Sequence, residues 1–355
     1  MLTLEPRNSI STSFQILSPV LALLLTLISG LIVFTILGHP PFKALYAFFI
    51  VPINNVYGIS ELLVKASPLI LIALGLAVGF RANVWNIGAE GQLIFGALIG
   101  SILPIYFSDS SNSLMLPLML LMGIFGGMFW AGIPAYLKIR FNTNEILTSL
   151  MLTYVATLLL SFLVHGPWRD PQGFNFPESV LFPDVATLPV IWSGTRAHLG
   201  ILLTFIAVIV IWWMLSRSLT GFKLRVYGEA PKAASYAGFR QSDMIRYSLL
   251  VSGGLAGLAG VIEVAGPIGQ LQPNISPGYG FTAIIVAFLG RLHPVGIVFG
   301  GLVLALSYLG GESVQISMGL PKGIAGVFQG LLLFYLLACD VLTRYKLRAV
   351  RLAGE

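Results

Sequence analysis

A long stretch near the start of the chain carries no charged side chain. Between Asn8 and Phe42 there is no Asp, Glu, Lys or Arg, and residues 17–37 are long enough to cross a bilayer as a helix, which takes about 20 apolar residues. Similar runs recur along the 355 residues, of which 56% are hydrophobic and 10% charged. A soluble domain carries about 25% charged residues, and membrane-barrel strands alternate in segments of about 10 residues. The runs therefore predict an all-α polytopic membrane protein.

About ten membrane-spanning helices are expected. The runs are residues 17–37, 66–81, 90–107, 114–137, 146–165, 198–215, 246–265, 279–290, 294–312 and 323–341. Two of them, 66–81 and 279–290, are short for a bilayer, and the apolar patch at 44–51 is too short to cross and is expected at the outer surface. We treat residues 1–355 as a single transmembrane domain.

The positions of Lys and Arg predict the side of the membrane that each loop faces, because short basic loops resist translocation. In the ten-span arrangement only Lys43, Lys65, Arg169, Arg196 and Lys322 fall outside. The other 15 of the 20 Lys and Arg residues lie on the cytoplasmic side, together with both termini. This asymmetry accounts for the net charge of +6, so the basic composition does not indicate nucleic-acid binding.

Two loops are longer than ordinary turns. The outer one, residues 166–197, contains five prolines and two tryptophans, a composition that favours a folded extracytoplasmic cap over a helix. The inner one, residues 216–245, contains a short helix predicted at 231–237, since Pro231 suits a first helical turn and Gly238 a left-handed stop. Small apolar side chains beside Tyr236 suit docking into a partner's groove, and the alternative is an amphipathic connector lying on the lipid headgroups.

Three segments resemble a transporter family. Residues 228–238 read GEAPKAASYAG, which is similar to the coupling-helix signature G-x-N-P-x-A-A-x-Y-A-G of ABC-transporter permeases of the branched-chain amino acid, ribose and nucleoside group, with Ala230 where Asn is usual. Residues 80–92 read FRANVWNIGAEGQ, and residues 278–290 read GYGFTAIIVAFLG before the PVG of 294–296; both resemble segments of simple-sugar and nucleoside permeases. The large outer loop resembles the larger of the two permeases in bacterial nucleoside importers.

The resemblance implies both a location and partners. It implies a bacterial inner-membrane protein working with ATP-binding subunits that bind the ATP, a second and unlike permease, and a lipoprotein or periplasmic solute receptor. It also implies inverted repeats over spans 2–5 and 7–10. The residues that it assigns to ATPase coupling are Gly228, Glu229, Pro231, Lys232, Ala233, Ala234, Tyr236, Ala237 and Gly238.

Polar residues inside the apolar runs are candidates for the substrate pathway, because irregular polar backbone at membrane depth is tolerated only in protein or beside a watery cavity. The first group surrounds a glycine-rich break and comprises Asn83, Trp85, Asn86, Glu90 and Gln92. A pathway-lining or gating role is one interpretation. The other places Glu90 at the cytosolic face as a solvated loop or helix-capping residue.

A second polar group follows the Gly253, Gly257 and Gly260 series, which suits close helix approach. Glu263 should face the bundle interior, because an unpaired carboxylate facing lipid is costly. Gln270, Gln272, Asn274, Tyr279 and Phe281 follow it. Amide and carboxylate groups suit ribose hydroxyls and base edges, and an aromatic ring can stack on a base. The alternative is an outer vestibule that is merely wet.

No reaction chemistry is indicated. The four histidines lack metal-ligand spacing, no G-x-x-x-x-G-K-[ST] segment occurs, and no cluster of catalytic acids or histidines is present, so we expect neither an enzyme nor a cofactor in this chain. The function that the resemblance implies is a permease subunit of an ATP-driven importer that moves a nucleoside or a related small polar solute into the cytoplasm. The alternatives are a ribose-like sugar as cargo, or a proton- or ion-coupled secondary transporter with Glu90 and Glu263 as carriers.

Overall fold

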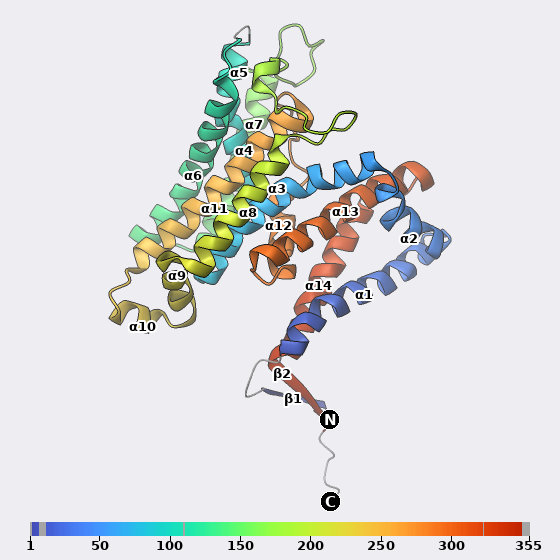
Figure 1. Cartoon of the computed structure of the whole chain (residues 1–355), viewed down its shortest axis with the longest axis vertical. Coiled ribbons are helices and arrows are strands. Elements are labelled where there is room, and N and C mark those ends of the chain that lie inside the picture. Colours follow the sequence, from blue (N-terminus) through green and yellow to red (C-terminus); the bar gives the residue numbers. More distant parts are fainter. Residues whose placement is uncertain (1, 7–11, 109–110, 322, 350–355) are drawn as a thin grey trace, which may run out of the picture. The chain divides into compact units, whose positions relative to one another are not determined.

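The computed structural model describes residues 2–6, 12–108, 111–321 and 323–349; Lys322 and the last residues of both termini lie outside this part. The described chain is nearly all helical and forms two compact units, residues 1–55 with 306–355 and residues 56–305 (Figure 1). Eight of its helices are long and apolar enough to cross a membrane. The prediction of a polytopic helical membrane protein is confirmed, and the single-domain assignment and the inverted repeat stay predictions.

The unit of the chain ends contains α1 (Thr12–Ile36), α2 (Pro41–Phe49), a 3-10 turn (Val51–Ile53), the end of α13 (Pro294–Met318) and α14 (Ile324–Arg344). Phe34, Phe48 and Phe328 meet at its centre, with Phe48 stacked on Phe328 at 4.5 Å between ring centroids. The patch at 44–51 falls in α2 and the 3-10 turn, and its place at the outer surface stays a prediction. Before α1 and after α14, β1 (Leu2–Pro6) pairs antiparallel with β2 (Tyr345–Ala349), an addition to the predicted all-α fold.

The central unit contains α3 (Val56–Arg81), α4 (Ala89–Gly100), α5 (Ile102–Tyr106), α6 (Met115–Phe141), α7 (Glu145–His165), α8 (Leu199–Arg217), α9 (Leu219–Glu229), α10 (Pro231–Tyr236), α11 (Gln241–Glu263), the π-helix η3 (Val264–Ile268), α12 (Tyr279–Leu289) and the first half of α13. A 3-10 turn, η2, occupies Asp184–Ala186 in the long loop.

Glycines set the core of this unit, where α4, α6 and α11 lie side by side (Figure 1). A Cβ at Gly257 would overlap the carbonyl oxygen of Gly123, and one at Gly127 would overlap that of Gly253. From the third helix, a Cβ at Gly96 would overlap the Cα of Gly257. Membrane helices use small residues for such backbone contact. The close approach predicted for the glycines of α11 is confirmed.

All ten apolar runs are helical, and one has very different bounds. The run at 66–81 is the C-terminal part of α3, which starts ten residues earlier, at Val56. The predicted run begins at Ala66, directly after the charged Lys65. Glu61, however, is buried inside α3 and is neutralised by Arg196 from the long loop. Tertiary pairing therefore carries the helix through its charged residues.

Two helices begin after non-helical chain inside the unit. Residues 84–88 are irregular before α4, and residues 269–278 separate η3 from α12, which has only 11 residues. At 1.5 Å per residue such a helix covers roughly 16 Å, about half of a bilayer core. The short run at 279–290 is therefore a half-length helix, reached through irregular chain.

Candidate functional site

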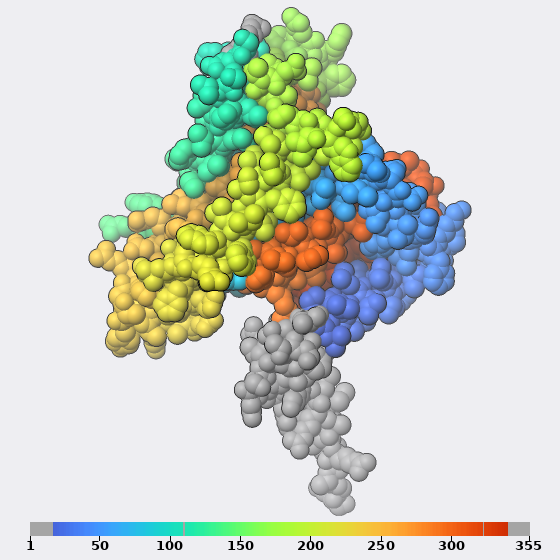
Figure 2. All heavy atoms as spheres, viewed as in Figure 1, coloured from blue at the N-terminus to red at the C-terminus, as the bar shows by residue number. Residues whose placement is uncertain are grey.

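The predicted coupling helix is present as α10. Pro231 is its first residue, and Gly238 follows it with φ +82°, the left-handed conformation that favours glycine. Ala230 precedes it without a side-chain capping bond, as expected where Asn is replaced. In Figure 2 the α9–α10 segment, coloured yellow to gold, forms an exposed end of the central unit.

The exposed surface of α10 is formed by one aromatic and small neighbours. Tyr236 is 94% exposed, and Lys232, Ala233 and Ala237 are exposed beside it. The prediction that Ala234 shares this surface is wrong, because its side chain is fully buried. Residues one position apart lie about 100° apart around a helix, so Ala234 packs inward when Ala233 faces out. A large exposed aromatic ring in a small-residue setting suits a docking surface.

Helix α9, which the sequence analysis missed, connects α10 to the membrane helices. A Cβ at Gly228 would overlap the carbonyl oxygen of Arg81, so α9 touches the last residue of α3 backbone to backbone. The Arg81 guanidinium in turn donates to the Leu292 carbonyl, at 3.1 Å from Nε and 2.8 Å from Nη2. Leu292 follows α12. Gly228 of the signature is therefore a contact residue, and a continuous path leads from α10 to α3 and α12.

The amide residues of the first polar group bind one another. Asn86 Nδ2 donates to Gln92 Oε1 and to Ser252 Oγ, both at 2.8 Å, and Gln92 Nε2 donates to Asn86 Oδ1 at 3.1 Å. Asn86 Oδ1 also accepts the backbone N–H of Gly88 at 3.1 Å. Asn86 and Gln92 are buried, so these amides satisfy the polar backbone of the irregular segment. In this conformation they hold the break together.

Glu90 holds the start of α12. Its Oε2 accepts the backbone N–H of Gly280 at 2.6 Å, and a Cβ at Gly280 would overlap the Glu90 backbone. Gly280 is the second residue of α12, where an unpaired N–H and the positive end of the helix dipole favour a carboxylate. The capping interpretation is thus supported, at a buried position instead of a solvated one. The pathway role of Glu90 stays a prediction.

The position of this contact follows from its neighbour on α11. Ser252, which binds Asn86, lies at the middle of the 23 residues of α11, one of the helices long and apolar enough to cross a membrane. The start of α4, the start of α12 and the Glu90 carboxylate therefore meet beside the middle of this helix. Half-helices whose N-termini converge near mid-membrane form the substrate sites of many transporters.

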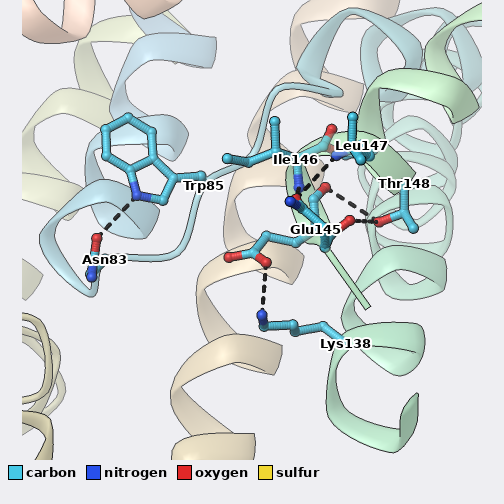
Figure 3. A network of polar contacts seen from close by, with 9 residues as sticks. Asn83, Trp85, Lys138, Glu145, Ile146, Leu147 and Thr148 are labelled. Atoms are coloured by element: carbon cyan, nitrogen blue, oxygen red, sulfur yellow. Dashed lines mark hydrogen bonds and ion pairs between the residues drawn. The ribbon is translucent and has the colours of Figure 1, made fainter. Parts of the chain in front are cut away.

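Asn83 and Trp85 lie away from this cluster. The Trp85 indole donates to Asn83 Oδ1 at 3.0 Å and packs in a cluster of three rings with Phe80 and Phe288, which also contact each other. Figure 3 shows both beside Lys138 and Glu145, whose ammonium and carboxylate groups are 3.0 Å apart. These four side chains line a cavity at the end of the unit that carries α10. The structure does not bring Asn83 and Trp85 together with Glu90.

The second polar group is dispersed around the segment after α11. Gln270 donates to Glu178 Oε2 of the long loop at 2.6 Å, Gln272 is half-buried, and Asn274 and Phe281 are exposed. Tyr279 is buried. The backbone of this segment also pairs with the long loop, through Leu188 to Ala265 at 2.7 Å and Phe182 to Gly269 at 2.9 Å. Residues 166–197 are therefore a folded cap laid along the approach to α12.

Glu263 is buried, with 8% of its surface exposed. The cations that act on it are Lys65 and Arg196. Arg196 also forms a bidentate pair with Glu61, Nε to Oε1 at 2.8 Å and Nη2 to Oε2. Sequence reasoning missed this pair because its members lie 135 residues apart.

Comparison with known proteins places the chain in a family. Residues 58–337 match the family described as branched-chain amino acid transport system / permease component. The chain belongs to this family. It is therefore an ABC transporter permease, a multi-pass membrane subunit from a family of transporter subunits, and such permeases work with separate ATPase and solute-binding proteins. The match includes the segments that carry Glu90, α10 and Gly280.

Relatives of the permease extend over nearly the whole chain. A glucose ABC transporter permease of Haloferax volcanii is 36% identical and aligns with 97% of this chain and 93% of its own. A guanosine ABC transporter permease of Bacillus subtilis is 29% identical, with 95% of each chain aligned. A nucleoside ABC transporter permease of Lactococcus lactis is 27% identical, with 91% of this chain and 90% of its own aligned.

Replacing Arg196 by alanine is expected to loosen the cap of the permease. The Glu61 side chain is 8% exposed and would lose both hydrogen bonds. Arg196 is half-exposed, so water replaces part of the interaction, and we expect a cost of about 1–3 kcal/mol. The measurement is the rate of proteolysis within 166–197. The control is Arg169→Ala, which removes an exposed bond to Asn175; equal rates in both variants would contradict the clamp.

The Glu263→Gln variant of the permease is expected to keep most of its transport rate. An amide of the same shape can hydrogen-bond a polar solute but cannot carry a proton, so the substitution separates a pathway residue from an ion carrier. The measurement is ATP-dependent uptake by the reconstituted transporter at matched protein levels. Complete loss of uptake by a folded variant would favour the carboxylate-coupled carrier.

Proposed function

We propose that the permease is one of two unlike membrane subunits of an ATP-driven importer that moves nucleosides into the cytoplasm. It lies in the cytoplasmic membrane with both termini and the 216–245 loop on the cytoplasmic side and residues 166–197 outside. ATP is bound by two partner ATPase subunits, and this chain holds no cofactor. A receptor, lipid-anchored or periplasmic, delivers the nucleoside to the outer surface.

The observation that carries this proposal is that α10 is exposed and that α9, the helix before it, contacts α3 backbone to backbone. Closure of the ATPases pushes on Tyr236 and its small neighbours. Because α9 contacts Arg81 and Arg81 binds the Leu292 carbonyl, the displacement reaches the end of the half-helix α12, whose start is held by Glu90. The cluster around Glu90 can then change its accessibility without any chemistry in this chain.

A second, different permease is supported by the relatives. The guanosine transporter of Bacillus subtilis, the nucleoside transporter of Lactococcus lactis and the glucose-named set of Haloferax volcanii each contribute two permeases that match this chain. In each organism one matches at least 91% of the chain and the other 70–77%. This chain corresponds to the member that matches over the greater length, and a shorter partner permease completes the pathway.

Nucleosides are the cargo favoured by two relatives that cover more than 90% of this chain. Amide and carboxylate groups near the half-helices suit ribose hydroxyls and base edges. A hexose is the second candidate, because the relative named for glucose is 36% identical. The same polar groups serve sugar hydroxyls, so the cargo is decided by experiment.

The test is uptake by the purified importer in proteoliposomes, with ATP inside and the loaded receptor outside. Labelled guanosine should accumulate with ATP and fail to accumulate with a non-hydrolysable analogue, and excess glucose should not compete. Tyr236→Ala should weaken ATPase association by roughly 30-fold, the effect of about 2 kcal/mol at an interface hot spot. Tyr154→Ala, at an exposed position on α7, is the matched control.

Three results would contradict the proposal. Accumulation of glucose without guanosine would assign the second cargo. Uptake that is independent of ATP and abolished by an uncoupler would identify a secondary transporter. Equal ATPase affinity in Tyr236→Ala and Tyr154→Ala would remove α10 from the coupling surface.

A further inference from the structure

A cavity of about 320 Å³ lies beside α10 and has no place in the transport path described above. Its walls come from segments far apart in the sequence: residues 83–85, the end of α6, the start of α7, α9, Pro231 and the start of α11. The volume falls at the lower end of the range of small-molecule sites, roughly 300–1,000 Å³. The cavity is therefore large enough for one small solute.

The wall of this cavity is rigid and aromatic on one side. Trp85 is held by a tilted ring contact with Phe80, at 4.9 Å between centroids, and by its bond to Asn83. Figure 3 shows the bond from the indole to Asn83. An aromatic ring held in place can accept a flat heterocycle without losing rotamer freedom.

The other side of the cavity is polar without a net charge. Lys138 and Glu145 neutralise each other at 3.0 Å, and Tyr227 and Gln241 add a hydroxyl and an amide. Burial raises the pKa of Tyr227, so the hydroxyl stays protonated and can donate. Such a wall offers no unpaired cation to a phosphate or carboxylate and suits a neutral solute with several hydrogen-bonding groups.

We propose that this cavity binds a neutral nucleoside from the cytoplasm, the transported product, and that its occupancy slows further import. The chemical class follows from the aromatic wall and the neutral polar wall, and the identification of the nucleoside as cargo rests on the proposed function. The site is separate from the cluster around Glu90, which Asn83 and Trp85 do not join.

Inhibition follows from the elements that the solute would contact. Pro231 is the first residue of α10, and Trp85 leads into the segment that carries Asn86 and Glu90. A solute bound between them stabilises the conformation that contains the cavity. The populations of the other conformations that α10 must adopt during transport fall by the factor 1 + [L]/Kd, where [L] is the solute concentration. At a cytoplasmic nucleoside concentration of about four times Kd, transport should therefore fall about fivefold.

The test has two measurements on the complete importer. Equilibrium dialysis of the receptor-free complex of both permeases and the ATPases with labelled guanosine gives Kd. Uptake from the loaded receptor is then measured in proteoliposomes whose lumen contains unlabelled guanosine at four times that Kd. Tyr227→Phe removes one hydroxyl and should weaken binding about fivefold, so the inhibition should fall to less than twofold.

Matched variants keep the result interpretable. Tyr136→Phe makes the same change at an exposed position of α6 that does not line the cavity, and it should bind and be inhibited like the wild type. Gln241→Ala alters the wall at an exposed residue and should weaken inhibition even if Tyr227→Phe folds poorly.

The outcomes separate this inference from the proposed function. Guanosine uptake that lumenal guanosine does not slow, or binding that is equal in wild type, Tyr227→Phe and Gln241→Ala, overturns the cavity site and leaves the importer intact. Guanosine binding that appears only after the ATPases are removed also overturns it, because an ATPase side chain would then fill the cavity in the complete importer. Absence of guanosine uptake by the wild type overturns the proposed cargo and this inference with it.

Discussion

Gly257→Ala is expected to lower the stability of the folded permease strongly. The added Cβ would overlap the carbonyl oxygen of Gly123 and approach the Cα of Gly127 at 2.9 Å, while Gly96 packs on the same residue from α4. Backbone atoms cannot move aside as a side chain can, so the helices must separate. We expect a loss of about 3 kcal/mol, the upper range of overpacking, which exceeds the gain of about 1 kcal/mol from helix propensity.

The control for this prediction is Gly254→Ala on the same helix. Its added Cβ would meet the end of the Met128 side chain at 2.9 Å, and a methionine terminus can rotate away. Thermal stability of the detergent-solubilised protein, read by size-exclusion chromatography after heating, should be near wild type for Gly254→Ala and strongly reduced for Gly257→Ala. Equal stability of the two variants would show that α6 and α11 are not packed backbone to backbone.

Glu90→Ala is expected to abolish transport and to lower stability, whereas Glu90→Gln should retain much of both. Alanine leaves the Gly280 N–H unpaired inside the protein, at a cost of about 1–3 kcal/mol. It also removes a negative charge at the N-terminus of α12, worth about 0.3–1 kcal/mol. A glutamine oxygen can still accept the Gly280 N–H, so only the charge is lost.

The comparison of the two Glu90 variants measures what the carboxylate does. Uptake and thermal stability should both fall in Glu90→Ala and should both be largely retained in Glu90→Gln, because both depend on the start of α12. A stable Glu90→Gln protein without uptake would contradict capping as the role of Glu90. It would instead favour titration of the carboxylate during transport.

Local sequence signals were sufficient for the helices and for α10. Long apolar runs fix the spanning helices because a bilayer admits few alternatives, and Pro231 and Gly238 fix the bounds of α10 through their backbone preferences. The small-residue series of α11 predicted close packing, although its partners Gly123 and Gly127 on α6 were not identified. Each of these features depends on residues that are neighbours along one helix.

Contacts between distant residues were beyond the same reasoning. The Glu61–Arg196 pair joins residues 135 apart, and Glu90 meets Gly280 across 190 residues. Without the first pair the start of α3 was placed too late, and without the second contact Glu90 had two interpretations. The sequence places Ala234 on the exposed surface, whereas the structure buries it. The packing of α10 on its neighbours decides which side of this two-turn helix is buried, and the residues of α10 alone do not reveal that packing.

The most direct test of the account is purification of the tagged permease from its native membrane in mild detergent, with mass-spectrometric identification and quantification of the proteins that accompany it. The account predicts an ATPase with a phosphate-binding loop and a second, shorter permease in stoichiometric amounts, with the ATPase lost in Tyr236→Ala and kept in Tyr154→Ala. A permease that is isolated alone and transports after reconstitution alone would contradict it.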